Sequence, residues 1–275
     1  MKYTSLLILG LLMVLISCKE KPALKNEKAA KLVSENTEGI SKTKSQMKSR
    51  IEQLNTDYCM GRFEPKGHED FVLIPIKYAD REGLYLRKDV LSEFTKMFEA
   101  AEKDGIHLQI RSATRNFYYQ KGIWERKWTG ATTLSDGTNV AKDLSTPKEK
   151  ALKILEYSSM PGTSRHHWGT DIDLNSFSNA YFEKGEGKRI YDWLTKNAAT
   201  YGFCQPYTPK GAERPHGYNE EKWHWTYQPL GREITQFAEL NLKNEMITGF
   251  KGAETAAEID VIGKYVLGIN QACNR

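Results

Sequence analysis

Two short segments of the sequence concentrate side chains that can bind a metal ion and carry out hydrolysis. The first is SRHHWGTDID, residues 164–173, and the second is EKWHW, residues 221–225. A catalytic zinc ion takes three protein ligands from His and Asp or Glu side chains and keeps one position open for water. These segments can supply such a set as His166, Asp173 and His224.

The local patterns are compatible with side chains that face a shared cleft. If Trp223, His224 and Trp225 form a strand, alternation sends both tryptophans to one face and the histidine to the other. In the same way, Asp171 and Asp173 share a face if their segment is extended, so only one of them need be a ligand. Each feature alone is weak, because a lone histidine is more often a structural residue than a ligand. The specificity comes from the pattern as a whole.

That pattern resembles a known family. Ser-x-His-x-x-Gly-x-x-x-Asp at residues 164–173, followed about fifty residues later by Glu-x-x-His at 221–224, is similar to the VanY-type D-alanyl-D-alanine carboxypeptidases. They belong to the zinc metallopeptidases that also include lysostaphin-like enzymes and the hedgehog zinc domain. Residues 110–115, with Gln120 after them, resemble the family's Ser-Gly-Tyr-Arg segment and its following Gln. The likeness covers roughly residues 84–230.

The resemblance implies a role for each matching residue. It makes His166, Asp173 and His224 the ligands of one zinc ion, Glu221 the general base and Arg115 a cation at the substrate carbonyl, with Ser112, Gln120 and Ser164 near the substrate. Zinc lowers the pKa of its bound water to about 7, and a carboxylate can take the water's proton and pass it to the leaving amine. A guanidinium stays charged and can stabilise the oxyanion.

Neighbouring residues compete for these roles. The family's spacing of seven residues from His to Asp selects His166 over His167. Asp171 could replace Asp173 only if that spacing were broken, and Glu220 is expected to be solvated.

The segment before Arg115 departs from the family pattern. Ala113 and Thr114 stand where the pattern has Gly and Tyr, which leaves the shape of the substrate pocket open.

The chain begins with features of an export signal. Lys2 is followed by an unbroken apolar run at residues 6–16, too short to cross a bilayer as a helix and suited to a signal peptide. Residues 15–18, Leu-Ile-Ser-Cys, resemble the lipobox of bacterial lipoproteins, which implies lipidation of Cys18 and removal of residues 1–17. An ordinary secretory signal is the alternative. We therefore expect an extracytoplasmic protein anchored by lipid to a bacterial membrane, and the sequence does not say which membrane.

Residues 18–62 are predicted to be a tether. They are rich in Lys, Glu, Ser and Asn, and apolar residues recur every seven positions at Val33, Ile40, Met47 and Leu54. This spacing indicates an amphipathic helix or a weak coiled coil, and a tether that lifts the body from the membrane is favoured over a dimerisation device. Residues 63–275 are expected to form the zinc peptidase domain, including a helical tail.

The elements of that domain mix helices and strands without a βαβ rhythm. Helices are predicted for residues 90–105, from Asn116 onward, for 191–200 and for 253–269; strands for 106–110 and 223–227; and a surface excursion for 127–148. We therefore expect an α+β fold, a single domain with a small antiparallel sheet flanked by helices.

The amino-acid composition is typical of a folded globular protein. The 275 residues are 39% hydrophobic, 27% charged and 11% aromatic, with a net charge of +5 and a mean hydropathy of −0.61. These values exclude a disordered chain or a membrane bundle, and without a basic stripe they do not indicate nucleic-acid binding. After Cys18, three cysteines remain, Cys59, Cys204 and Cys273, enough for one disulfide whose pairing the sequence leaves open.

The resemblance and the expected compartment together imply a peptidase that removes a terminal D-alanine from peptidoglycan stem peptides. LD-carboxypeptidase or endopeptidase action on the same polymer is the alternative, and so is a zinc-containing wall-binding lipoprotein without turnover. Glu221 argues against the last, because a binding module needs no base at that position. The oligomeric state stays open.

Overall fold

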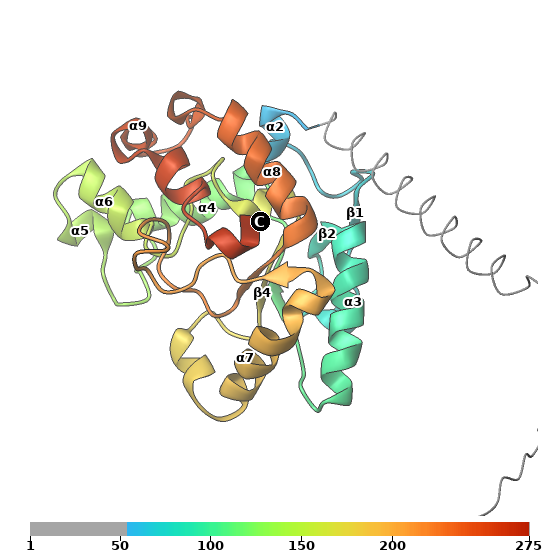
Figure 1. The fold of residues 1–275 in the computed structure, drawn as a ribbon. Coiled ribbons are helices and arrows are strands. Elements are labelled where there is room, and N and C mark those ends of the chain that lie inside the picture. The colour runs from blue at the N-terminus through green and yellow to red at the C-terminus, as the bar shows by residue number, and fades with distance from the viewer. Residues whose placement is uncertain (1–53, 275) are drawn as a thin grey trace, which may run out of the picture. The chain divides into compact units, whose positions relative to one another are not determined.

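A computed structural model describes residues 54–274 (Figure 1). The predictions of a signal peptide, of lipidation at Cys18 and of a helix across most of the tether lie outside these residues. Within residues 54–274, no helix combines the length and the apolar character needed to cross a membrane.

Two small antiparallel sheets form the strand part of the fold. One pairs β1 (Phe71–Leu73) with β2 (Tyr85–Arg87). The other has the strand order β3-β4-β6-β5 and is built from β3 (Ile110–Ser112), β4 (Asp171–Leu174), β6 (His224–Tyr227) and β5 (Phe203–Cys204). The central pair, β4 and β6, carries two of the predicted metal ligands, Asp173 and His224.

Helices make up much of the rest of the described body (Figure 1). They are α2 (Thr56–Cys59), α3 (Lys88–Lys103), α4 (Phe117–Trp128), α5 (Val140–Asp143), α6 (Pro147–Ile154), α7 (Gly185–Asn197), α8 (Gln228–Asn241) and α9 (Thr255–Ile259). Short 3-10 turns include η2 (Arg165–Trp168) and η4 (Ala198–Tyr201), and η6 (Ile262–Val266) is π-helical. The prediction of a mixed fold with a small antiparallel sheet flanked by helices is confirmed for these residues.

The helix boundaries follow local signals in the sequence. The Asn116 side chain accepts a hydrogen bond from the Tyr119 amide (2.8 Å), which fixes the start of α4 where it was predicted. In α3, the apolar side chains at Val90, Phe94 and Met97 are buried together on one face.

The strand predicted at residues 106–110 is only partly formed. The alternation holds, because Ile106 and Leu108 are buried, yet β3 starts only at Ile110. Strand pairing stops before Ile110 because the Gln109 backbone forms its hydrogen bonds with Asn175 and not with a neighbouring strand. Asn175 has a left-handed φ of 59°. The turn that follows β4 therefore takes the place of strand pairing at Gln109.

Two apolar clusters lie in the described body. One joins α3, α7 and one face of the larger sheet, and includes Trp223 and Trp225. The other joins α4, α6, α8 and α9 and includes Trp124 and Trp168. Tyr58 also belongs to this second cluster, although it lies in the segment, residues 18–62, that was predicted to be a tether. The segment 164–173 contributes Trp168 to the second cluster and Ile172 to the first.

The C-terminal tail differs from the single helix predicted for residues 253–269. It divides into α9 and η6 at Asp260, which adopts a left-handed φ of 57°. A disulfide joins Cys204 in β5 to Cys273 near the chain's end, while Cys59 is a buried free thiol. This pairing ties the tail to the larger sheet.

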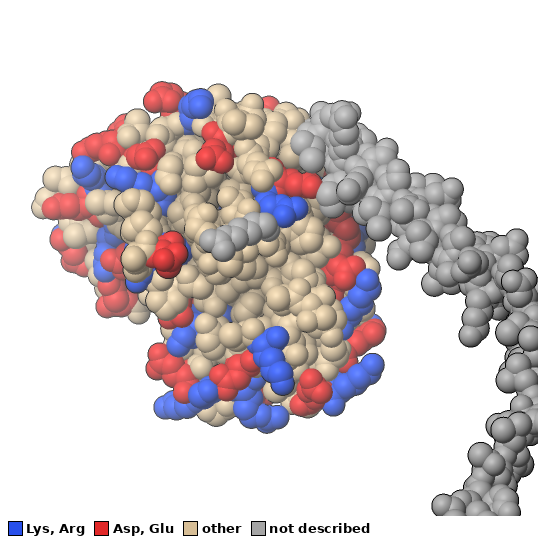
Figure 2. Space-filling view, in the orientation of Figure 1, with Lys and Arg blue, Asp and Glu red and all other residues tan. Residues whose placement is uncertain are grey.

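Charges of both signs are spread over the face shown in Figure 2. Lys and Arg side chains alternate with Asp and Glu around the rim of that face, and neutral residues cover much of its middle. On the described residues of this face, the excess positive charge is not gathered into one basic patch.

Candidate metal centre and active site

The sheet brings the two polar segments into register. Strands β4 and β6 are antiparallel, with Asp173 directly opposite His224 and Asp171 opposite Thr226. His166 lies on η2, just before β4, and Gly169 reverses the chain between them with a left-handed φ of 72°. A Cβ at Gly169 would overlap the Phe71 ring, so glycine is required there for steric as well as conformational reasons.

His166, Asp173 and His224 converge, and all three are buried. One ligand atom from each lies within 4.8 Å of the others, close enough to share one metal ion. His166 Nε2 is 3.2 Å from one oxygen of Asp173, and His224 Nδ1 is 3.3 Å from the other. The three residues selected from the sequence therefore form one cluster.

Hydrogen bonds fix which ring nitrogen of each histidine is available. His166 Nδ1 lies 2.8 Å from the Ala113 carbonyl oxygen, to which it can only donate. His224 Nε2 lies 2.8 Å from Asp171 Oδ2. Each ring therefore turns its other nitrogen, Nε2 of His166 and Nδ1 of His224, toward Asp173. Outer carbonyl and carboxylate partners of this kind orient metal-binding histidines.

The donor set fits a divalent cation. His166 Nε2 and Asp173 Oδ1 are buried without a hydrogen bond of normal geometry, which is costly unless another group binds them. Three carboxylates, Asp171, Asp173 and Glu221, surround His224. Burial opposes the charged form of His224, but these carboxylates outweigh it and raise the pKa of His224 to about 10. The cluster thus attracts positive charge, and a metal ion can take the place of that proton.

Asp171 and Arg165 form a buried support that the sequence analysis did not identify. Arg165 Nε lies 3.1 Å from Asp171 Oδ2, and its other nitrogens donate to Thr226 and Thr235. Thr226 also donates to Asp171 Oδ1 at 2.7 Å. Burial alone would raise the pKa of Asp171, yet Arg165 and His224 hold that pKa well below its usual range. Asp171 is therefore placed to orient the His224 ring, while Asp173 faces both histidines.

Replacing Asp171 by Asn is expected to weaken metal binding. The Asn side chain is neutral, so His224 Nε2 loses its charged hydrogen-bond acceptor. Loss of such an outer partner costs about 10- to 100-fold in metal affinity. Competition with a calibrated zinc chelator measures the effect, with the exposed Asp192→Asn as control. Because Arg165 would lose its counter-ion, thermal unfolding must show that the variant is folded at the assay temperature. Unchanged affinity in a folded variant would contradict this role.

Glu221 lies beside the cluster on the segment leading into β6. Its Oε2 is 3.0 Å from His224 Nδ1, and its side chain is buried. Backbone bonds hold it, because its amide donates to the Tyr207 carbonyl (2.9 Å) and its carbonyl accepts from Gln205 (3.2 Å). Burial raises the pKa of the Glu221 carboxyl above its ordinary value. A raised pKa makes the carboxylate a stronger base, which suits it to accept and return a proton.

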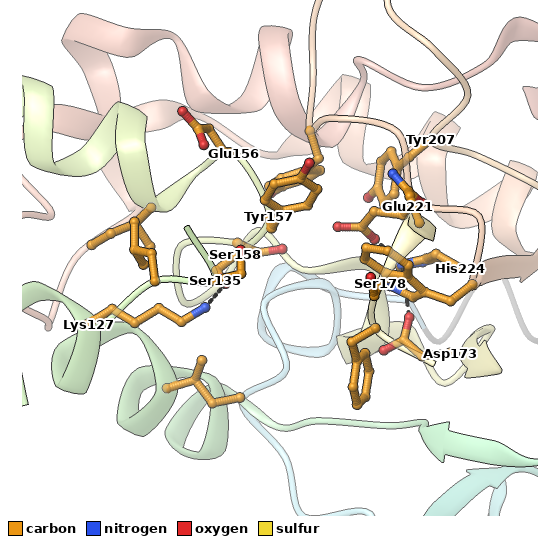
Figure 3. A pocket seen from close by; sticks show the side chains of 18 of the residues that line it. Lys127, Ser135, Glu156, Tyr157, Ser158, Asp173, Ser178, Tyr207, Glu221 and His224 are labelled. Carbon is orange, nitrogen blue, oxygen red and sulfur yellow. Dashed lines mark hydrogen bonds and ion pairs between the residues drawn. The ribbon is translucent and has the colours of Figure 1, made fainter. Parts of the chain in front are cut away.

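The cluster opens into a cavity of about 710 Å³. Figure 3 shows Asp173, Glu221 and His224 on one side of it and Lys127, Ser135 and Ser158 on the other. Part of the predicted surface excursion, residues 133–136, lines this cavity. The excursion thus forms a wall of the site.

The remaining predicted site residues divide into two groups. Arg115 and Ser164 line the cavity. Ser112 and Gln120 are not among its lining residues: Ser112 accepts a hydrogen bond from Arg115 (2.9 Å), and Gln120 donates to the Ser159 carbonyl (2.8 Å). In this structure the latter pair therefore supports residues that line the cavity.

Arg115 is held in place from both sides. Its backbone amide donates to the His166 carbonyl (3.1 Å), and its carbonyl lies 2.5 Å from His167 Nδ1. Its guanidinium is 3.7 Å from Asp173 Oδ2 and is hydrogen-bonded to Ser112. His167, which competed with His166 in the sequence, instead fixes the backbone of Arg115.

Tyr207 and Tyr218 line the cavity and were not found from the sequence. The Tyr207 ring packs edge-on against His224, with 4.8 Å between ring centroids, and also contacts Tyr218. The segment that carries them has no periodic pattern, and the one available signal is that both precede the Glu-x-x-His motif by fewer than fifteen residues.

Comparison with known proteins identifies the family. The family model described as VanY, D-alanyl-D-alanine carboxypeptidase, matches residues 83–230, more than half of the chain. The chain belongs to this family.

Two curated relatives are similar over part of their length. YodJ of Bacillus subtilis, provisionally named a carboxypeptidase, is 29% identical over 184 residues, which cover 63% of this chain and 58% of YodJ. A D-alanyl-D-alanine carboxypeptidase of Enterococcus faecalis is 28% identical over 131 residues, covering 48% and 44%. The chain spans about half the length of these relatives.

Solved structures show weaker likeness. The LD-carboxypeptidase LdcB is 23% identical with a TM-score of 0.46, covering 75% of this chain and 78% of that one. A variant of the vancomycin-resistance D,D-pentapeptidase VanY in complex with Zn(II) is 22% identical with a TM-score of 0.42, covering 71% and 92%.

Proposed function

We propose that this chain is a zinc-dependent D-alanyl-D-alanine carboxypeptidase that trims peptidoglycan stem peptides. The observation that carries the proposal is the convergence of His166, Asp173 and His224, with Glu221 beside them, at the wall of a peptide-sized cavity. Membership of the VanY family supports the reaction class. A His₂-carboxylate set with an open position is the ligand pattern of catalytic zinc.

Each residue has a defined task in this reaction. A bound zinc ion would supply Lewis acidity and lower the pKa of a water molecule. Glu221 accepts the proton of the attacking water and delivers it to the leaving amine, since its carboxylate lies beside His224 Nδ1. Arg115 stabilises the negative charge that develops on the carbonyl oxygen, because its guanidinium lines the same cavity near Asp173.

Digestion of defined muropeptides tests this function. The purified full-length chain, loaded with zinc, is incubated with pentapeptide, tetrapeptide and crosslinked stems, and the products are weighed by mass spectrometry. Loss of the terminal D-alanine from the pentapeptide is the expected result. Cleavage only of the tetrapeptide or of the crosslink would replace the proposal by LD-carboxypeptidase or endopeptidase activity. No cleavage of any stem would favour a wall-binding protein without turnover.

We also propose that the protein is anchored by lipid outside the cytoplasm, where peptidoglycan is found. The support is the apolar run at 6–16 followed by Leu-Ile-Ser-Cys at 15–18. Mass spectrometry of the mature N-terminus is expected to find Cys18 as the first residue, carrying acyl chains, and Cys18→Ser should leave the precursor uncut. A mature N-terminus at another position, with an unmodified Cys18 thiol, would contradict the anchor.

A further inference from the structure

Lys127 lies in the last turn of α4 and is directed into the main cavity (Figure 3). Its ammonium donates a hydrogen bond to Ser158 Oγ. Asp173, Glu221 and His224 lie across the cavity from it in the same view. The mechanism described above does not use Lys127.

Lys127 has no acidic partner in the part of the chain that the structure describes. Every ion pair there involves other cations, and no carboxylate lies within 4.0 Å of its ammonium. Lys153, which lines the same cavity, contrasts with it: Lys153 pairs with Asp136 at 2.7 Å and with Glu156 at 2.9 Å. Lys127 is thus a cation left available inside the cavity.

Holding such a charge away from water has a cost. Burial, with the nearby charge of Arg115, lowers the pKa of Lys127 to about 8. The amine is still mostly protonated at pH 7, so the cavity contains a partly desolvated ammonium without a counter-ion. An anion supplied by a ligand would remove this cost and gain a charge-assisted hydrogen bond.

The arrangement of the cavity indicates which anion that is. The metal cluster and Glu221 take the peptide carbonyl and the leaving nitrogen, and Arg115, held by Ser112 and Asp173, is assigned to the carbonyl oxygen. A carboxypeptidase substrate carries its free carboxylate one residue beyond the bond that is cut. We propose that Lys127, together with Ser158, binds the free C-terminal carboxylate of the peptide substrate. This proposal rests on the function proposed above. The pair thereby selects chain ends over internal bonds.

The test compares one stem pentapeptide as its free acid and as its C-terminal amide. The wild-type chain is expected to prefer the acid. In Lys127→Met, kcat/KM for the acid should fall about 10- to 100-fold, mainly through KM, because a hydrogen bond to a charged group contributes about 1.5–3 kcal/mol. The amide should change little, and Lys127→Arg should retain the preference. Lys121→Met, on the same helix but outside the cavity lining, is the matched control.

Binding gives a second readout. Calorimetric titration of both peptides into zinc-loaded Glu221→Gln, with and without Lys127→Met, should show the acid losing affinity and the amide keeping it. An unchanged acid-to-amide ratio, or an equal loss for both peptides in a folded variant, overturns the role of Lys127. If the wild type cleaves neither peptide and the Glu221→Gln chain binds neither, the proposed function itself fails. The two failures are therefore distinguishable.

Discussion

Replacing Glu221 by Gln is expected to lower hydrolysis of a stem pentapeptide by about 10²- to 10⁴-fold, the range that a general base contributes. Gln keeps the size of the side chain, but it cannot accept the water's proton. The Glu221 carboxylate lies 3.0 Å from His224 Nδ1 and is buried, so no other described side chain duplicates its position. Metal content should stay at the wild-type level.

The measurement pairs single-turnover kinetics with metal analysis of the same preparation. Glu220→Gln is the control, because Glu220 is the adjacent carboxylate and does not line the cavity. Turnover at the wild-type rate in Glu221→Gln would remove its assignment as the base. Loss of metal together with activity would show that Glu221 acts in binding the ion instead.

Replacing Asp173 by Ala should bring turnover to the background level through loss of the metal. The substitution leaves His166 and His224 as the only donors of the three-residue cluster. Removing an outer partner costs about 10- to 100-fold in metal affinity, so removing a ligand should cost more than that. The side chain removed is also the only group that contacts both histidines in the cluster at 3.2–3.3 Å.

Chelation followed by zinc titration measures this effect. Zinc should restore activity to the stripped wild type and to Asp192→Ala, whose side chain is exposed and paired with Lys188. It should not restore Asp173→Ala at equivalent concentrations. An Asp173→Ala chain that retains one metal ion per molecule and full activity would contradict the ligand assignment.

Local patterns in the sequence predicted the strand part of the site. Alternation around His224 placed Trp223 and Trp225 in the core, and the structure has both buried in one cluster. The same rule put Asp171 and Asp173 on one face. It could not assign their tasks, because those depend on the cross-strand register that sets Asp173 opposite His224.

Residues that act through long-range contacts were not predictable. Arg165 reaches Thr235 in α8, seventy positions away, and Lys127 in α4 meets Ser158, which follows α6 and lies 31 positions further along the chain. Neither contact leaves a periodic or motif signal in the sequence. The disulfide between Cys204 and Cys273 likewise depends on how the tail returns to β5, which no spacing rule encodes.

Anomalous diffraction at the zinc edge, from crystals of the zinc-loaded full-length chain, tests the central claim most directly. We predict one peak at about 2.0–2.2 Å from His166 Nε2, His224 Nδ1 and an Asp173 oxygen, the usual range for zinc with nitrogen and carboxylate ligands. A peak bound by Asp171 in place of Asp173, or no peak between the two histidines, would contradict it.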